Sequence, residues 1–188
     1  MQDWRVSMEK AKSCKVAVIL SLGVGFIVAL IAAYIGAEQI HATSTVEFCN
    51  SCHEMNIFHK AWAAGPHGPN AKGIIVARCV DCHLPHDSLS NYLIVKTKAG
   101  LHDIKAHKMG KKTQWLKLWK NRGPYYHEAY ESGCLECHKD LIAPGIPLKA
   151  ITAHKTYLAG QSERDCLDCH YKVGHGDLVQ IFRDAGHQ

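Results

Sequence analysis

Eight of the nine cysteines in this sequence share one pattern, in which two cysteines three positions apart are followed directly by a histidine. Two thiols at this spacing can form thioethers to the vinyl groups of a porphyrin, and the next imidazole can reach the iron from the same side. Zinc sites, redox dithiols and disulfides would use the cysteines alone and would leave the four histidines unexplained. The pattern therefore predicts four covalently bound c-type haems. The predicted attachment residues are Cys49, Cys52, Cys79, Cys82, Cys134, Cys137, Cys166 and Cys169, and the adjacent iron ligands are His53, His83, His138 and His170.

Low-spin electron-transfer haems take a second strong axial ligand, and the remaining histidines offer candidates through a repeat. His67 lies 18 residues after Cys49 and His154 lies 20 residues after Cys134, and each precedes the next motif by 12 residues. A further histidine closes each half. These matched positions indicate two similar di-haem halves, with His67, His86, His154 and His175 as second ligands. Histidines outside the repeat are expected at the surface or in packing, namely His59, His102, His107 and His127.

Met55 stands two residues after His53 and is a further candidate at the first iron. It could bind the iron in place of His53, or it could pack on the porphyrin without binding. The choice matters because His and Met ligands give different reduction potentials.

An apolar run precedes the first motif and predicts where the haem domain lies. Residues 16–36 form 21 positions without a charge, about 31 Å as a helix, which is enough to span a bilayer. Arg and Lys exceed Asp and Glu before the run, so the positive-inside rule puts residues 1–15 in the cytoplasm and residues 37–188 in the periplasm. The alternative is a cleaved signal peptide, whose apolar core would be shorter and would end at a better cleavage site.

About 150 residues follow the apolar run and carry all four motifs, which leaves little polypeptide for each haem. The porphyrins are therefore expected to form most of the apolar core. The predicted fold is mainly α with much irregular structure: one N-terminal transmembrane helix and a small multihaem domain with di-haem halves at residues 46–87 and 131–176. The net charge is +5, but Lys and Arg are dispersed, which argues against nucleic-acid binding.

Residues 88–122 join the two halves and are predicted to be mainly helical. Leu89, Leu93, Lys96, Gly100 and Asp103 recur at intervals of three and four, so they would share one helix face. Residues 115–120 mix tryptophan with lysine, which suits either a membrane–water interface or packing of the tryptophans on haem faces.

With its N-terminal anchor and four motifs, the chain resembles the NapC/NirT family of tetrahaem quinol dehydrogenases over nearly its whole length. The more specific matches are His41-Ala42-Thr43-Ser44-Thr45, Cys52-His53-Glu54-Met55, Pro66-His67-Gly68 and Cys82-His83-Leu84-Pro85-His86. The resemblance implies that His67, His86, His154 and His175 are the distal ligands. In the nitrite-reductase branch of the family, the Met of the first motif is the ligand and quinol binds beside that haem. A Lys and an Asp seven residues apart line that quinol site, and Lys96 and Asp103 match them. A carboxylate or amine there is a natural acceptor for the protons that quinol oxidation releases.

The resemblance implies a single-pass protein of the bacterial inner membrane that acts as a quinol dehydrogenase in anaerobic respiration. It would oxidise quinol, with menaquinol expected, and pass electrons through four haems to a periplasmic multihaem or molybdenum reductase acting on nitrite, nitrate or another N-oxide. Its partners would be the quinone pool, the lipid bilayer and the reductase, in a stable complex or as a homo-oligomer. The alternative is an electron carrier that docks a multihaem, hydroxylamine-oxidoreductase-like partner and delivers electrons to the quinone pool.

Overall fold

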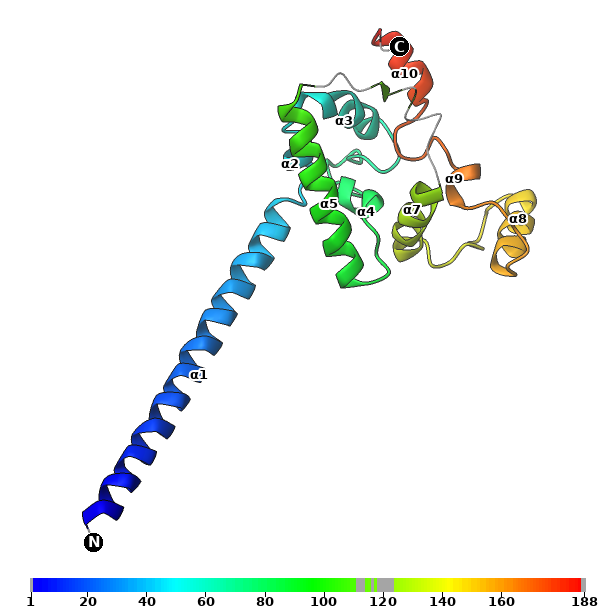
Figure 1. Ribbon diagram of the computed structural model, residues 1–188. Helices are drawn as coiled ribbons and strands as arrows, with labels where there is room; N and C mark the ends of the chain where they lie inside the picture. The colour runs from blue at the N-terminus through cyan, green and yellow to red at the C-terminus, as the bar shows by residue number, and fades with distance from the viewer. Residues whose placement is uncertain (1, 111–113, 116, 118–123, 187–188) are drawn as a thin grey trace. The chain divides into compact units, whose positions relative to one another are not determined.

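The computed structural model describes residues 2–110, 114–115, 117 and 124–186 of the 188-residue chain. The chain divides into two compact units, Met1–Thr43 and Ser44–Gln188. The first unit is one helix and the second is a bundle of short helices and loops (Figure 1).

The first unit is helix α1, Gln2–Ala42, of 41 residues. Its segment Lys15–Ala42 has a mean hydropathy of 2.8 in its most apolar window, and none of that window is buried within the protein. Exposed apolar side chains run along it from Val16 to Ile35. The segment is thus long and apolar enough to cross a membrane, and the helix continues past residue 36, the predicted end of the span.

The second unit is built from short helices. They are α2 (Val46–Cys49), a 3-10 helix (His53–Met55), α3 (Asn56–Ala63), α4 (Cys79–His83), α5 (Leu89–Lys108), α7 (Pro124–Cys137), α8 (Leu148–Leu158), α9 (Cys166–Cys169) and α10 (Leu178–Asp184). The part of this unit that the structure describes contains no β-strand, and its one β feature is an isolated bridge between Pro69 and Ile75. The prediction of a mainly helical fold with much irregular structure is confirmed.

Three of the four cysteine motifs coincide with a helical turn, which places their two cysteines on the same side of the backbone, whereas the first motif runs from the end of α2 through a turn to Cys52. The second motif is α4 and the fourth begins with α9. Both turns are closed by the aspartate between their cysteines, because Asp81 accepts from the backbone N–H of Arg78 at 2.8 Å and Asp168 from that of Asp165 at 3.1 Å. The Asp in these two motifs therefore caps the helix that holds the cysteines.

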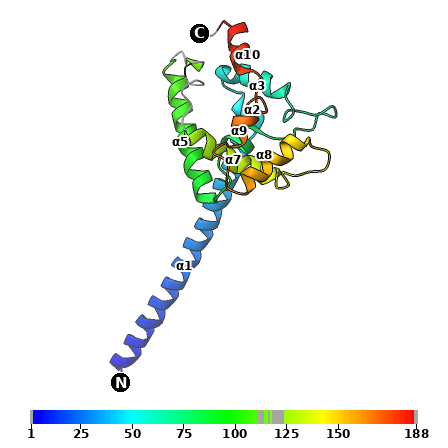
Figure 2. The same ribbon diagram turned by 90° about the vertical axis from the view of Figure 1, so that its right-hand side faces the viewer.

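Helix α7, which ends in the third motif, packs against both α4 and α9 (Figure 1), and Figure 2 shows α7 and α9 from a second side. The close contact with α4 is made by Gly133, where a Cβ atom would collide with the backbone carbonyl of Asp81. A glycine directly before Cys134 is thus what allows the second and third motifs to approach each other.

The polypeptide supplies little core of its own. Six apolar side chains of the described residues are buried, namely Val46, Trp62, Val80, Leu84, Leu178 and Phe182. Of these Phe182 is the most enclosed, at 1% exposure, and its ring packs edge-on against Phe58 of α3. A domain of this length normally buries a far larger apolar surface. The small core fits the expectation that the porphyrins contribute most of the apolar interior.

The segment between the halves contains the 20-residue helix α5, which starts at the N-cap Ser88. Residues 111–113, 116 and 118–123 lie outside the described part of the chain, so the interpretation of residues 115–120 is tested at Trp115 alone. Trp115 packs edge-on against Phe58 at 4.8 Å between ring centroids. The contact is with a protein side chain, so both interpretations of residues 115–120 stay predictions.

Candidate haem centres

The fold brings cysteines of successive motifs close to one another. Cys49 of the first motif lies within hydrogen-bond distance of Cys79 of the second. Cys134 and Cys166 form the equivalent pair between the third and fourth motifs. Cys82 also lies near Cys137, so the second motif neighbours the third.

Three of the four motif histidines face a histidine from the predicted set of second ligands. The ring centroids are 6.1 Å apart for His67 and His138, 6.0 Å for His83 and His175, and 6.2 Å for His154 and His170. With metal–imidazole bonds of about 2.0–2.1 Å, two rings on opposite sides of one ion have centroids about 6 Å apart. The spacing of all three pairs therefore fits a shared iron.

In these pairs, the three predicted second ligands also keep their Nε2 atom available for an iron, because their Nδ1 atom is hydrogen-bonded elsewhere. The Nδ1–H of His67 donates to the Val173 carbonyl at 3.3 Å, that of His154 to Leu141, and that of His175 to Phe58 at 3.0 Å. Such a bond fixes the tautomer in which Nε2 is unprotonated and available to a metal.

Burial favours the neutral form of the His83–His175 pair. His83 is exposed by its accessible surface, but the surrounding protein and the His175 ring lower its pKa to about 4. Burial also lowers the pKa of His175. Tyr130 lies 3.0 Å from His83 Nδ1 through its hydroxyl, so the outer nitrogen has a partner. Neutral imidazole is the form that binds metals.

His86 is the remaining predicted second ligand, and it belongs to none of these three histidine pairs. Its Nε2 is buried and has no hydrogen-bond partner in the described structure, which is unusual for a buried polar atom. Its backbone N–H donates to the Ser132 hydroxyl at 3.0 Å, and its ring lies 6.1 Å from that of Tyr92. The paired histidines, the orphaned His86 nitrogen and the small core together fit a chain that binds haem.

The surroundings of the first motif differ from those of the other three. His53 is largely exposed, with 79% of its side chain accessible, and half-buried Met55 ends the same short 3-10 helix. The ring of His107, near the end of α5, lies 5.6 Å from that of His53. His107 Nδ1 is 3.0 and 3.1 Å from the two carboxylate oxygens of Glu54.

Lys96 and Asp103, the residues matched to a quinol site, lie on α5 and both act electrostatically on Cys49 of the first motif. Lys96 Nζ donates to the buried Ser44 hydroxyl at 2.7 Å and lies over the Tyr92 ring at 5.9 Å. Burial lowers the pKa of Lys96. Asp103 is exposed, with 75% of its side chain accessible.

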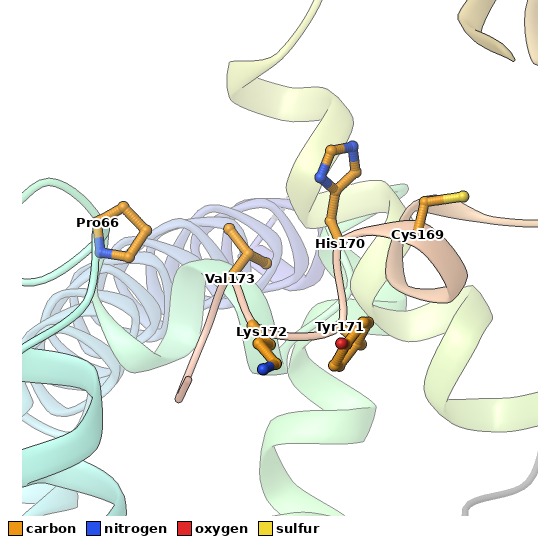
Figure 3. A pocket seen from close by; sticks show the side chains of 6 residues that line it. All are labelled: Pro66, Cys169, His170, Tyr171, Lys172 and Val173. Carbon is orange, nitrogen blue, oxygen red and sulfur yellow. The ribbon is translucent and has the colours of Figure 1, made fainter. Parts of the chain in front are cut away.

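A cavity of about 370 Å³ lies beside the fourth motif. Figure 3 shows Pro66 on one loop, across from the end of α9 and the loop that follows it, which carry the other lining residues, Cys169, His170, Tyr171, Lys172 and Val173. Because Pro66 directly precedes His67, the cavity adjoins residues of both the third and the fourth candidate centres.

The sequence interpretation missed Glu54 and His107, which meet although 53 positions separate them. His107 was expected to be a surface or packing residue because it falls outside the repeat. The signal that could have found it is its position four residues after Asp103, one helical turn along α5. His127 belongs to α7, but its side chain lies outside the described part of the structure.

Comparison with known proteins gives consistent results. The NapC/NirT cytochrome c family, N-terminal region, matches residues 11–181. The chain is 30% identical to the cytochrome c-type protein TorY of Haemophilus influenzae, over 90% of this chain and 46% of TorY, so it spans about half of that relative. It is 28% identical to the tetraheme c-type cytochrome CymA of Shewanella oneidensis, over 92% of this chain and 97% of CymA.

A solved structure is similar as well. It is the crystal structure of the cytochrome c nitrite reductase NrfHA complex bound to the HQNO inhibitor, with a TM-score of 0.56 and 25% identity. The match covers 84% of this chain and 90% of that chain.

Proposed function

The chain belongs to the NapC/NirT cytochrome c family, and from this premise we propose that it is a membrane-anchored tetrahaem quinol dehydrogenase that supplies electrons to a periplasmic reductase. As a family member it is a c-type cytochrome that carries haem c and transfers electrons. The number of haems, quinol as the electron donor and the reductase as the electron acceptor belong to the proposal.

The proposal assigns the four cysteine motifs to four haems and three histidine pairs to their irons. His67 would bind opposite His138, His175 opposite His83, and His154 opposite His170, as supported by ring spacings of 6.0–6.2 Å. Two of these pairs join different halves of the sequence. The haem supplies one-electron redox chemistry, and the chain tunes it through axial ligands and burial.

The serial arrangement of the motifs, with Lys96 and Asp103 beside the first of them, is the observation that carries the proposal. Cys49 neighbours Cys79 at one end of the series, and Cys134 neighbours Cys166 at the other. Electrons that enter at the first motif would therefore leave at the fourth.

Quinol oxidation must dispose of two protons as well as two electrons. Lys96 is suited to the quinol hydroxyl because burial lowers the pKa of its ammonium group and Ser44 fixes its position. Asp103 is a proton acceptor with access to water, as its exposure indicates. In this proposal Lys96 orients the quinol and Asp103 passes protons to solvent.

The N-terminal helix is proposed to anchor the protein in the bacterial inner membrane, where quinol is dissolved. The basic residues before the helix support a cytoplasmic N-terminus and a periplasmic haem domain. The likeness to a subunit of the NrfHA complex supports a multihaem nitrite reductase as the type of partner. The same likeness supports a stable complex between this protein and that reductase.

The experiment that tests this function is stopped-flow reduction of the detergent-purified holoprotein by a menaquinol analogue, followed in the haem α-band. We expect rapid reduction that HQNO inhibits. Failure of quinol to reduce the protein, while dithionite reduces it fully, would refute the quinol dehydrogenase function for the isolated chain.

The role of Asp103 is tested in the same assay with Asp103→Asn. Quinol reduction should slow by about 100-fold, the lower limit of the range for a lost acid–base group, while dithionite reduction is unchanged. Asp184→Asn on α10 is the matched control, because it removes an exposed carboxylate far along the chain from α5. Equal quinol kinetics in the two variants would exclude Asp103 from proton transfer.

A further inference from the structure

The motif histidine of the second candidate centre has a hydrogen-bond partner of its own in the fold. In each of the three histidine pairs, the second ligand donates its Nδ1–H to a backbone carbonyl. Among the motif histidines that the structure describes, His83 is the one whose Nδ1 lies within hydrogen-bond distance of another side chain, the hydroxyl of Tyr130 at 3.0 Å. In the His83–His175 pair, therefore, both rings have a partner at Nδ1.

The protonation of a metal-bound imidazole determines the direction of this hydrogen bond. When Nε2 of His83 binds iron, Nδ1 carries the proton, so Nδ1–H donates and the Tyr130 oxygen accepts. The two rings are nearly perpendicular, at 87° with centroids 5.0 Å apart, so the phenol ring also limits rotation of the imidazole. We propose that Tyr130 is the positioning residue of the second haem centre, where it orients His83 and makes its Nε2 more basic. This inference rests on the proposed function, because it presumes a haem at the second motif.

The residues that follow Tyr130 on α7 hold it against the second motif. The Ser132 hydroxyl accepts from the backbone N–H of His86 at 3.0 Å, and Gly133 lies directly against the backbone carbonyl of Asp81. These two contacts are made before and after the motif histidine in the sequence. Helix α7 therefore cannot slide along the second motif without breaking one of them, and the position of the tyrosine hydroxyl is fixed by packing as well as by its own hydrogen bond.

The acceptor for His83 is a neutral hydroxyl, although a carboxylate stands next to it in the sequence. The Glu131 carboxylate accepts from the Tyr157 hydroxyl of α8, with an O–O distance of 2.5 Å. A phenol oxygen accepts a weaker hydrogen bond than an ionised carboxylate does. Tyr130 therefore raises the basicity of the imidazole without the larger effect that a carboxylate partner would have.

The hydrogen bond has a consequence for the reduction potential of the second haem. A more basic imidazole stabilises ferric iron more than ferrous iron, because ferric iron carries the higher charge. Hydrogen bonding to the outer side of an axial ligand is one of the means by which a protein sets the potential of a haem. Removal of the Tyr130 hydroxyl should therefore raise the midpoint potential of one haem and leave its two histidine ligands in place.

The test is a redox titration of the purified holoprotein with chemical mediators, followed by EPR and in the haem α-band. Tyr130→Phe keeps the ring and should shift one midpoint potential upward, with the other haems unchanged and no new high-spin signal. Tyr157→Phe is the matched control, because it removes a tyrosine hydroxyl that is bonded to Glu131 and not to His83. Unchanged potentials in Tyr130→Phe would overturn the inference, and so would an equal shift in Tyr157→Phe, which would indicate general loosening of α7.

A second measurement assigns the effect to the haem that His83 binds. His175→Ala should leave that haem five-coordinate in the ferrous state, where resonance Raman spectroscopy records the iron–histidine stretching vibration. A hydrogen bond donated by Nδ1–H strengthens the iron–histidine bond and raises this frequency. Adding Tyr130→Phe to His175→Ala should therefore lower the frequency, whereas adding Tyr157→Phe should not. An unchanged frequency, or a His175→Ala protein without a five-coordinate haem, would overturn the inference.

Intact mass, measured on every variant, counts the covalent haems. Fewer than four haems in the wild-type protein would refute the tetrahaem function itself. Four haems together with unaltered potentials and an unaltered stretching frequency in the Tyr130→Phe proteins would refute only the positioning role. Neither measurement uses quinol, so both outcomes are independent of the quinol dehydrogenase activity.

Discussion

Gly133→Ala tests whether the second and third motifs are held together by direct packing of α4 and α7. The added methyl group would collide with the carbonyl of Asp81, which is backbone and cannot rotate away. Overpacking of this kind costs about 1–3 kcal/mol. Gly133 lies within α7, so its substitution by alanine also gains the helix preference of alanine over glycine, and the proper reference is another helical Gly→Ala variant. For a domain of this size each kcal/mol lowers Tm by roughly 2–4 °C, so Gly133→Ala is expected to unfold about 2–12 °C below that reference.

The assay is thermal unfolding of the detergent-solubilised holoprotein, followed by circular dichroism in the far ultraviolet and in the haem Soret band. Gly100→Ala is the control, because a Cβ at that position in α5 meets nothing within 4 Å. Alanine favours a helix over glycine by about 1 kcal/mol, so the control should unfold at the same or a higher temperature. A Gly133→Ala protein as stable as the Gly100→Ala control would show that α4 and α7 do not pack closely.

Three further outcomes are expected. His67→Ala should convert one haem to high spin. In a chain whose third motif carries no haem, the same substitution should create no further high-spin haem. A further high-spin haem in that chain would mean that His67 binds another iron. Ser44→Ala removes the hydroxyl that accepts from Lys96, so KM for quinol should rise several-fold and Ser44→Thr should restore it. The backbone N–H of Gln180 holds the pKa of Asp177, the N-cap of α10, below its ordinary value of about 3.9. Its stabilising effect is therefore present above that value and lost as pH falls through the lowered pKa, so Asp177→Asn should weaken the acid dependence of Tm.

Much of the architecture could be predicted because it depends on local pattern. The charge-free run of residues 16–36 predicted a long apolar helix, and α1 contains it. The interval shared by His67 and His154 marked them as members of one class, and each lies opposite a motif histidine. Periodicity also predicted that Lys96 and Asp103 would lie on one helix, which they do.

What sequence could not supply is the choice of partner for each histidine. Similar halves suggest pairing within each half, but His67 faces the third motif and His175 faces the second. This exchange depends on the approach of α4 to α7 at Gly133, a contact between residues far apart in sequence. His107 escaped notice for a related reason: its neighbour Glu54 belongs to another element, and no counterpart in the second half drew attention to it.

The exchange of partners has a consequence for biogenesis. A chain that is threaded through a membrane from its N-terminus delivers the second motif to the far side well before His175, its proposed partner, which lies 92 residues after His83. The second haem would then wait with one protein ligand until the residues through the fourth motif have crossed. Completion of that early centre would thus report that the second half has been translocated, and the first half could not mature as an independent unit.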